Sequence, residues 1–495
     1  MDFISTRGIE NKRVSAAYAI KTGLASDSGL YMPESIPQFE NGELDILLKC
    51  SYVERAAHII GKFLTDYTYE ELLEDASAAY SSDKFGDSPA PTTHISKNMY
   101  MLELWHGPTC AFKDMALQIM PRLFVRALRK TDEHRTALIL VATSGDTGKA
   151  ALEGYRDVDG TKMLVFYPTD GVSRIQKLQM QTQEGSNLSV LGLKGNFDDA
   201  QNGVKKIFAD PEMILALDKH AHFLSSANSI NWGRLVPQIV YYVSAYLDMV
   251  RASTILMGDK INVCVPTGNF GNIFAAYIAK LMGLPINKLV CASNSNNVLT
   301  DFLATGTYDK NRHFYQTISP SMDILISSNL ERLLYLVAGQ EKTRIYMQKL
   351  ASEGKYTVDR EDFAKISESF IGYYTDEKAT CDTIKSVYEN ENCLIDTHTS
   401  VAVNAAQKYN DAYGAERKIL VVSTASPYKF AKDVYKSLTG NAPFCDDTEA
   451  LNALSLLTGV ECPGPLASVT SKDLLHSDII GKEDMNNAVA DFVKA

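Results

Sequence analysis

The sequence predicts an α/β protein with two open, mostly parallel sheets that carry helices on both faces, together with a small N-terminal domain. Between about 98 and 220, short apolar runs alternate with stretches of helical spacing, a pattern typical of a parallel sheet covered by helices. A second alternating region follows within 226–440. The chain of 495 residues is long enough for two to four domains with large cores, so we expect these regions to form separate domains.

The N-terminal domain is predicted over residues 1–90. The segment 24–33 is rich in turn-forming residues, and apolar residues recur at helical spacing over 52–64 and 69–80. The polar stretch 82–93 contains two prolines, which indicates a linker to the next domain.

A small α/β domain is predicted over 91–225, and it carries the lysine loop described below. Its apolar runs are short and bounded by turn-forming residues, as in buried strands. The strands are expected at 98–105, 136–142, 162–167 and 188–193, and the helices at 115–128, 149–155, 173–183 and 198–208.

A larger α/β domain is predicted over 226–440, followed by a C-terminal extension, mostly helical, over 441–495. A helix is expected at 234–250, with Pro237 in its first turn, where proline is tolerated. The stretch 295–395 is rich in charge and helical spacing and is expected to be a helical insertion. The strands of this domain are expected at 260–265, 288–292 and 418–423.

Composition excludes several classes of function. The net charge of −11 argues against a nucleic-acid-binding surface. No apolar run reaches the length of a membrane span, and the N-terminus lacks the basic and apolar regions of a signal peptide. The eight cysteines include no Cys-x-x-Cys pair, which favours reduced thiols in the cytoplasm. No metal site is expected, because His220 and His222 have no third ligand nearby.

The stretch 104–118, Leu-Trp-His-Gly-Pro-Thr-Cys-Ala-Phe-Lys-Asp-Met-Ala-Leu-Gln, has Lys113 near its centre. The lysine follows a turn at 107–109 and precedes the helix expected from Met115. A helix N-terminus repels an ammonium group and lowers its pKa. Because only a neutral amine attacks a carbonyl, this position suits a lysine that forms a Schiff base. The alternative is a surface lysine that happens to follow a turn.

Ligands bind open α/β sheets at the carboxyl ends of the strands, and the loop 143–148 is the first at such a position. Its sequence, Thr-Ser-Gly-Asp-Thr-Gly, follows an expected strand and opens a helix, so its amides and hydroxyls could hold an anion. It is not a nucleotide-binding P-loop, since the motif requires glycine where Thr143 stands and serine or threonine where Ala150 stands.

Two further loops follow expected strands. In the loop 266–272, Pro-Thr-Gly-Asn-Phe-Gly-Asn, two glycines three residues apart would make an amide-lined cradle for a phosphate. The loop 423–427, Ser-Thr-Ala-Ser-Pro, could offer a hydroxyl to a ring nitrogen. Taken alone, each loop could also be an ordinary turn.

Arg234 follows the amide-rich segment 226–233 and is suited to bind a phosphate or carboxylate through two parallel hydrogen bonds. The alternative is a surface arginine at a helix start, which the helix macrodipole disfavours. A lysine for a Schiff base, a phosphate cradle and a hydroxyl for a pyridine nitrogen are together what a pyridoxal phosphate enzyme requires.

Several long motifs, in the same order along the chain, resemble the threonine synthase family of the bacterial and fungal type. This family belongs to the fold-type-II group of pyridoxal phosphate enzymes, whose fold is like that of the tryptophan synthase β subunit. The motifs lie at 5–8, 23–33, 106–114, 142–148, 268–272 and 319–324.

The resemblance implies an enzyme that converts O-phospho-L-homoserine and water into L-threonine and phosphate by γ-elimination and β-addition of water. Lys113 would hold the cofactor as a Schiff base and then move protons on the substrate. The implied residues for pyridoxal 5'-phosphate are Lys113, Gly268, Asn269, Phe270, Gly271, Asn272 and Thr424, and those for substrate are Ser144, Asp146, Thr147, Asn228, Ser229 and Arg234. We further expect a cytoplasmic protein that is a monomer or a homodimer.

Two alternatives remain open at this point. The first is a dehydratase or β-replacement enzyme on the same cofactor, against which Arg234 and the N-terminal domain argue. The second is a non-catalytic relative that binds a phosphorylated ligand, against which the presence of Lys113 argues.

Overall fold

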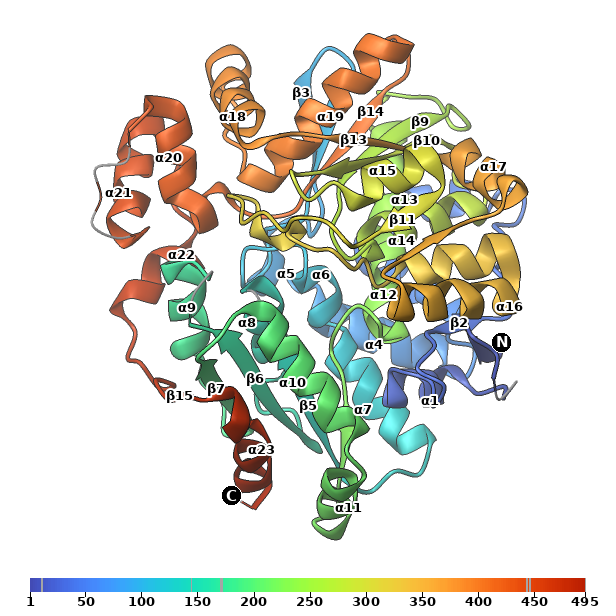
Figure 1. Ribbon diagram of the computed structural model, residues 1–495. Helices are drawn as coiled ribbons and strands as arrows, with labels where there is room; N and C mark the ends of the chain where they lie inside the picture. The colour runs from blue at the N-terminus through green and yellow to red at the C-terminus, as the bar shows by residue number, and fades with distance from the viewer. Residues whose placement is uncertain (10–11, 144, 170–171, 442–443, 445–446, 495) are drawn as a thin grey trace.

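The computed structural model describes residues 1–9, 12–143, 145–169, 172–441, 444 and 447–494. A six-stranded sheet lies in the upper half of Figure 1, with the strand order β13-β10-β9-β14-β4-β3. All neighbours pair in parallel except β3, which pairs antiparallel with β4 at the edge. The strands are β3 (Thr92–Ser96), β4 (Met99–Glu103), β9 (Ile261–Pro266), β10 (Ile286–Ser293), β13 (Phe370–Tyr374) and β14 (Ile419–Ser423).

The second sheet has five strands in the order β15-β7-β6-β5-β8, and all of its pairings are parallel. It occupies the lower half of Figure 1, where the C-terminal segment returns to lie beside β7. The strands are β5 (Thr136–Ala142), β6 (Thr161–Pro168), β7 (Leu188–Leu193), β8 (His222–Ser225) and β15 (Ile479–Ile480). The two sheets confirm the predicted fold class.

Helices cover both faces of the six-stranded sheet because successive residues of each strand point to opposite faces. Val263 packs in the cluster that contains α13 and α14, whereas its neighbour Cys264 packs in the cluster that contains α19. The helices of this half are α12 (Trp232–Leu235), α13 (Pro237–Arg251), α14 (Gly271–Leu281), α15 (Val298–Thr305), α16 (Leu330–Ser352), α17 (Arg360–Ser369), α18 (Glu377–Glu391), α19 (Thr397–Tyr413) and α20 (Ala431–Thr439).

The same alternation places helices on both faces of the five-stranded sheet. Leu138 packs toward α10 and α23, and Ile139 packs toward α7 and α8. The helices of this half are α6 (Asp114–Leu117), α7 (Met120–Lys130), α8 (Asp146–Tyr155), α9 (Arg174–Gln181), α10 (Phe197–Ala209), α11 (Pro211–Lys219) and α23 (Met485–Lys494). The C-terminal helices α21 (Asp447–Thr458) and α22 (Gly464–Ala467) pack instead in the cluster that contains α19 and α20.

The N-terminal unit is a two-stranded antiparallel sheet with helices packed on it. Ser51 and Thr68 begin two of the helices with capping boxes, in which the cap hydroxyl and a glutamate satisfy exposed backbone amides. The elements are β1 (Phe3–Ser5), α1 (Ala16–Thr22), β2 (Tyr31–Pro33), α2 (Glu43–Lys49), α3 (Tyr52–Gly61), α4 (Tyr69–Ala79) and α5 (Ser82–Phe85).

Short elements complete the chain. They are the hairpin of β11 (Thr307–Asp309) with β12 (Lys355–Thr357) and four 3₁₀ turns, η1 (Pro320–Met322), η2 (Pro427–Phe430), η3 (Ser468–Ser471) and η4 (Lys482–Asp484).

The structure differs from the sequence prediction in where some strands belong. β4 was expected with the strands of 91–225, but it pairs with β14 in the six-stranded sheet. The stretch 295–395, expected to be helical, contributes the edge strand β13, and the C-terminal extension contributes β15. These pairings join segments distant in sequence, so no local pattern reveals them. The predicted domain boundaries stay predictions.

Two expected helices are each divided in the structure. The helix expected at 115–128 forms the short α6 and then α7, and the helix expected at 234–250 forms α12 and then α13. Pro237 is the first residue of α13, as expected for a proline in the first turn. The division matters because α6 follows Lys113 and α12 carries Arg234.

Helix α8 packs very closely on α6, and we expect Gly154→Ala to disturb that contact. A Cβ at Gly154 would lie 2.0 Å from the carbonyl oxygen of Leu117. Because this neighbour is backbone, the helices must separate, which should lower the free energy of unfolding by about 1–3 kcal/mol in urea titrations. Gly464→Ala is the control, since its Cβ would meet nothing within 4 Å. Equal unfolding midpoints for the two variants would contradict this packing argument.

Candidate active site

Lys113 lies at the boundary between the two halves of the molecule, at the N-terminal end of α6. Its loop runs beside the segment that follows β14: the Phe112 amide donates to the Thr424 carbonyl at 2.8 Å, and Ala111 forms a bridge with Ala425. β4 and β14 are parallel neighbours, so their carboxyl ends meet at the same sheet edge. The pairing therefore brings Lys113 and Thr424 together from positions far apart in sequence.

The amine of Lys113 is buried and has two polar neighbours. Nζ lies 3.2 Å from Asp146 Oδ2 and 3.4 Å from Ser321 Oγ. Burial lowers the pKa of Lys113, and the charges of Arg234 and Lys429 lower it further, while Asp146 opposes the change. The predicted lowering of the Lys113 pKa is therefore confirmed, but its main cause is burial and not the helix N-terminus. α6 has only four residues, so its macrodipole is a minor influence.

Asp146 is the first residue of α8 and is almost completely buried. Its Oδ1 lies 2.8 Å from Lys429 Nζ and accepts a hydrogen bond from Gln176 Nε2 at 2.9 Å. Burial alone would raise the pKa of Asp146, but the charges of Lys113 and Lys429 outweigh it and hold that pKa well below its usual range. Asp146 is therefore ionised and shared between two lysines.

Lys429 was missed by the sequence analysis, although it lies only five residues beyond Thr424. Its side chain is fully buried. The signal available in the sequence is the run Pro-Tyr-Lys-Phe-Ala, in which the lysine has an aromatic residue on each side. Such a run suggests a buried lysine, and a fully buried lysine almost always has a partner.

The predicted phosphate cradle connects β9 to α14. Phe270 has a left-handed conformation, with φ 65° and ψ −6°, and Gly271 begins the 11-residue helix. A Cβ at Gly268 would lie 2.6 Å from the Ser321 carbonyl oxygen, so only glycine fits there. The loop is fixed from behind, since the Asn329 side chain donates to the Asn269 carbonyl at 3.0 Å. Its geometry suits an anion at a helix N-terminus.

Asn272 ends the cradle and has an unused donor. Its Oδ1 accepts hydrogen bonds from the hydroxyls of Tyr241 and Tyr242, both at 2.5 Å. Its Nδ2 is buried and has no hydrogen-bond partner among the residues that the structure describes. A buried donor without a partner is costly, and a bound phosphate oxygen would satisfy it. The residues present therefore fit a phosphorylated cofactor.

Arg234 is buried on α12 without a counter-charge. Its guanidinium donates to the Ala227 carbonyl at 2.8 Å and lies 3.5 Å from Thr147 Oγ1. Within the described parts of the chain, no carboxylate lies within 4.0 Å of it. Burial lowers the pKa of Arg234 to about 10. Because a buried charge needs a partner, this arginine is prepared to bind an anion.

Asn228 and Ser229 lie in the loop before α12, and both are partly buried. Ser229 Oγ accepts a hydrogen bond from Asn329 Nδ2 at 2.9 Å. Asn329 also contacts the Asn269 carbonyl, so this one amide connects the Arg234 loop with the glycine cradle.

Ser321 and His398 were not predicted as site residues. Ser321 lies beside Lys113 in the motif 319–324, and its backbone amide donates to His398 Nε2 at 3.1 Å. His398 Nδ1 lies 2.9 Å from Asp396 Oδ1. The histidine thus fixes the turn that bears Ser321. Because this turn lies in the motif 319–324, the motif was the sequence signal from which Ser321 could have been predicted as a site residue.

The contacts above join Lys113, Asp146, Thr147, Arg234 and the loop 268–272 into one site. Thr424 reaches it through its backbone hydrogen bond with Phe112. Ser144 lies outside the described residues.

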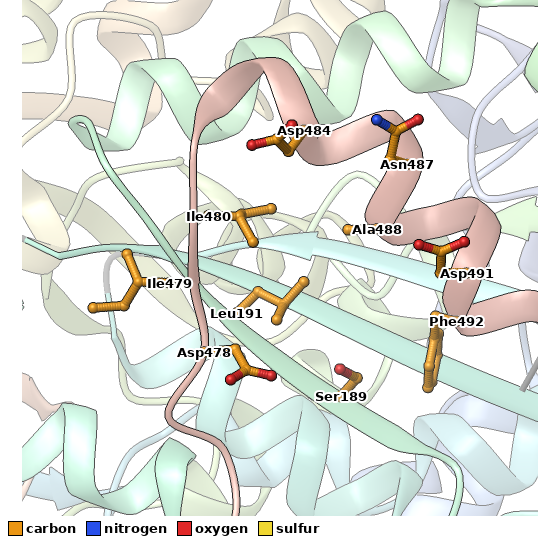
Figure 2. A pocket seen from close by; sticks show the side chains of 10 residues that line it. All are labelled: Ser189, Leu191, Asp478, Ile479, Ile480, Asp484, Asn487, Ala488, Asp491 and Phe492. Atoms are coloured by element: carbon orange, nitrogen blue, oxygen red, sulfur yellow. The ribbon is translucent and has the colours of Figure 1, made fainter.

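Two cavities lie elsewhere. One of about 570 Å³ separates β7 from α23, and Figure 2 shows the carboxylates of Asp478, Asp484 and Asp491 around it. The other, of about 930 Å³, lies beside Asn262, near the start of β9. It is therefore near the amino end of this strand, whereas Lys113 lies near the carboxyl ends of the parallel strands. No predicted site residue lines either cavity.

The described residues contain no group of three or more potential metal ligands. Across the same residues, no helix is both long enough and apolar enough to cross a bilayer.

Comparison with known proteins gives two family matches. Residues 2–80 match the family described as threonine synthase N terminus, and residues 87–425 match the family described as pyridoxal-phosphate dependent enzyme.

Similar proteins cover most of the chain. Threonine synthase-like 1 from Macaca fascicularis is 41% identical over 88% of this chain, and the chain spans 60% of that relative's length. Threonine synthase from Pseudomonas aeruginosa is 36% identical, with 90% of this chain and 92% of that protein covered. The crystal structure of PLP-bound threonine synthase from Brucella melitensis superposes with a TM-score of 0.87 at 35% identity, with both chains fully covered. The predicted fold-type-II relationship is thereby confirmed.

If Arg234 binds an anion, inorganic phosphate should stabilise the protein already loaded with pyridoxal phosphate, whose own phosphate would fill the loop 268–272, and Arg234→Met should remove that effect. At a phosphate concentration ten times the dissociation constant, binding to the folded state adds about 1.4 kcal/mol, which raises the thermal unfolding midpoint. Arg312→Met is the matched control, because Arg312 is already paired with Asp301 at 2.8 Å. A phosphate-dependent shift that persists in Arg234→Met would exclude this role.

Proposed function

This chain belongs to the threonine synthase family of pyridoxal-phosphate-dependent enzymes, and from that membership we propose that it converts O-phospho-L-homoserine and water into L-threonine and phosphate, the last step of threonine biosynthesis. The observation that carries the proposal is a buried lysine of lowered pKa in the same site as a buried arginine that lacks a carboxylate partner. The first suits an amine that attacks a carbonyl, and the second suits a substrate phosphate.

The residues around Lys113 fit pyridoxal 5'-phosphate as the cofactor. When bound, this cofactor supplies an electron sink that stabilises negative charge on the carbon atoms of an amino-acid substrate. The loop 268–272 would hold its phosphate, through amides at the start of α14 and the unpartnered Nδ2 of Asn272. Thr424, at the end of β14, would offer a hydroxyl to the ring nitrogen.

Lys113 would act as the proton carrier of the reaction. A neutral amine can accept a proton from a substrate carbon, and the resulting ammonium can return it to a neighbouring carbon. Its burial excludes water, which would otherwise exchange with the carried proton. Asp146 Oδ2, at 3.2 Å, stabilises the ammonium between these two steps.

The substrate would lie between α8 and α12. Thr147 and the loop 143–148 would receive its carboxylate at the N-terminus of α8. Arg234, with Asn228 and Ser229, would bind its phosphate. Once the phosphate leaves carbon, the same arginine would retain it inside the site, where its oxygens could accept a proton from the attacking water.

The proposal places the enzyme in the cytoplasm as a monomer or homodimer that binds no nucleic acid. The seven cysteines that the structure describes are free thiols, and free thiols persist in a reducing compartment.

The test is to add pyridoxal phosphate to the purified protein, record its absorbance, and then assay threonine and phosphate after adding O-phospho-L-homoserine. We expect a visible absorbance band and both products. Lys113→Ala should lose the band and lower turnover by at least about 10³-fold, because proton transfer and attachment of the cofactor both fail. Lys130→Ala, on the surface end of α7, is the matched control.

The results also separate the alternatives. A band without products from phosphohomoserine would indicate a dehydratase or β-replacement enzyme on the same cofactor. Phosphohomoserine binding without a band would indicate a non-catalytic relative. Full turnover by Lys113→Ala would contradict the proposed mechanism.

A further inference from the structure

Lys429 is a second buried lysine at the site, and every N–H of its ammonium has an acceptor. Nζ donates to the Thr109 carbonyl at 2.9 Å and to Gln179 Oε1 at 3.0 Å, and lies 2.8 Å from Asp146 Oδ1. An ammonium has three donors, so none remains for a ligand. Lys429 is therefore a fixed charge, and it is unsuited to act as a nucleophile or a substrate contact.

The two oxygens of Asp146 have different partners. Oδ1 faces Lys429 and Gln176, whereas Oδ2 faces Lys113. The contacts at Oδ1 come from η2 and α9, which fix the rotation of the carboxylate. As a result, Oδ2 is held toward the amine of Lys113.

The charge balance changes what Asp146 does to Lys113. With Asp146 as its sole charged neighbour, Lys113 would form a neutral buried ion pair and would keep its proton firmly. With Lys429 bound to the same carboxylate, the cluster of two ammonium groups and one carboxylate carries a net positive charge. Loss of the Lys113 proton then leaves these three groups with no net charge, which the low-dielectric surroundings favour, and the positive charge of Arg234 favours the same loss.

Of the described residues, the charged groups that act most strongly on Lys113 are Asp146 from α8, Lys429 from η2 and Arg234 from α12. Asp114 adjoins it in sequence, but its carboxylate is occupied by the amide and hydroxyl of Thr109 at 2.8 and 2.7 Å. Burial raises the pKa of Asp114 to about 6, and it carries charge above that pH.

We propose that Lys429 is a positioning residue that holds the Asp146 carboxylate ionised and turned toward Lys113, and whose own charge allows the Lys113 ammonium to release its proton. The proposal rests on the proposed function, because a neutral Lys113 is what Schiff-base formation requires. Lys429 itself does not touch the substrate or the cofactor.

The test measures the Lys113 amine directly, in the full-length protein prepared without pyridoxal phosphate. The protein is labelled briefly with acetic anhydride at a series of pH values, and mass spectrometry quantifies acetylation of the peptide that contains Lys113. Only the neutral amine reacts, so the midpoint of the profile is its pKa. In Lys429→Met the midpoint should rise by on the order of one pH unit, and labelling below the midpoint should slow about tenfold.

Lys149→Met is the matched control. Lys149 is a partly buried lysine on the same helix as Asp146, but it is paired with Glu153 at 3.0 Å. This variant removes a lysine charge without changing the Asp146 carboxylate, so the Lys113 profile should not move. Lys429→Arg keeps the positive charge beside Asp146, so its Lys113 midpoint should lie closer to that of the unaltered protein than the midpoint of Lys429→Met does.

An unchanged Lys113 midpoint in folded Lys429→Met, or an equal rise in Lys149→Met, would overturn the proposal. If Lys429→Met does not fold, Asp146→Asn provides the second measurement. Removing the carboxylate leaves two lysines that repel each other, so the midpoint should fall by on the order of one unit, and an unchanged midpoint would again overturn the proposal. Since labelling needs no cofactor, its result is independent of whether the unaltered protein forms the visible band.

Discussion

The buried carboxylate of Asp146 is the interaction on which the rest of the site depends. It joins segments that belong to different parts of the chain: α8 carries it, Lys113 precedes α6, Gln176 lies on α9, and Lys429 lies in η2 after β14. Burying one charge without partners is prohibitive, and removing one partner of a buried pair typically costs about 3–5 kcal/mol. The carboxylate therefore requires that these segments assemble together.

The N-terminal unit supports the other side of the same site. Asn231, at the start of α12, donates to the Ile20 carbonyl at 2.8 Å. Trp232 packs against Phe3 and Phe63, with ring centroids 5.5 and 5.6 Å apart. Arg234 lies on this four-residue helix, which is too short to hold its own orientation. The N-terminal unit thus helps to set the position of the guanidinium that we propose as the anion-binding group.

Arg332 adds a second connection of the same kind. Its buried guanidinium donates to the carbonyls of Tyr31, Ser229 and Ile230, so it ties the N-terminal unit to the loop before α12. In the proposed binding mode, the two ends of the substrate would be held by different means. One end would meet the N-terminus of α8, beside the five-stranded sheet, and the other would meet Arg234, whose loop is held by the N-terminal unit and α16.

Elements with a local signal could be predicted from the sequence alone. Short apolar runs indicated β5, β6, β7, β9, β10 and β14, and the glycine loop 268–272 was predicted from its place after a strand. It also indicated Lys113, because a lysine after a turn at a strand end is a local feature. Other features could be read only from the tertiary structure: β4 joins β14, β13 and β15 extend the sheets, Ser321 faces Lys113, and Lys429 shares the Asp146 carboxylate with Lys113. The physical reason is that backbone pairing across a sheet and the sharing of a buried charge are contacts between distant segments, and their energy appears only once both segments are desolvated together.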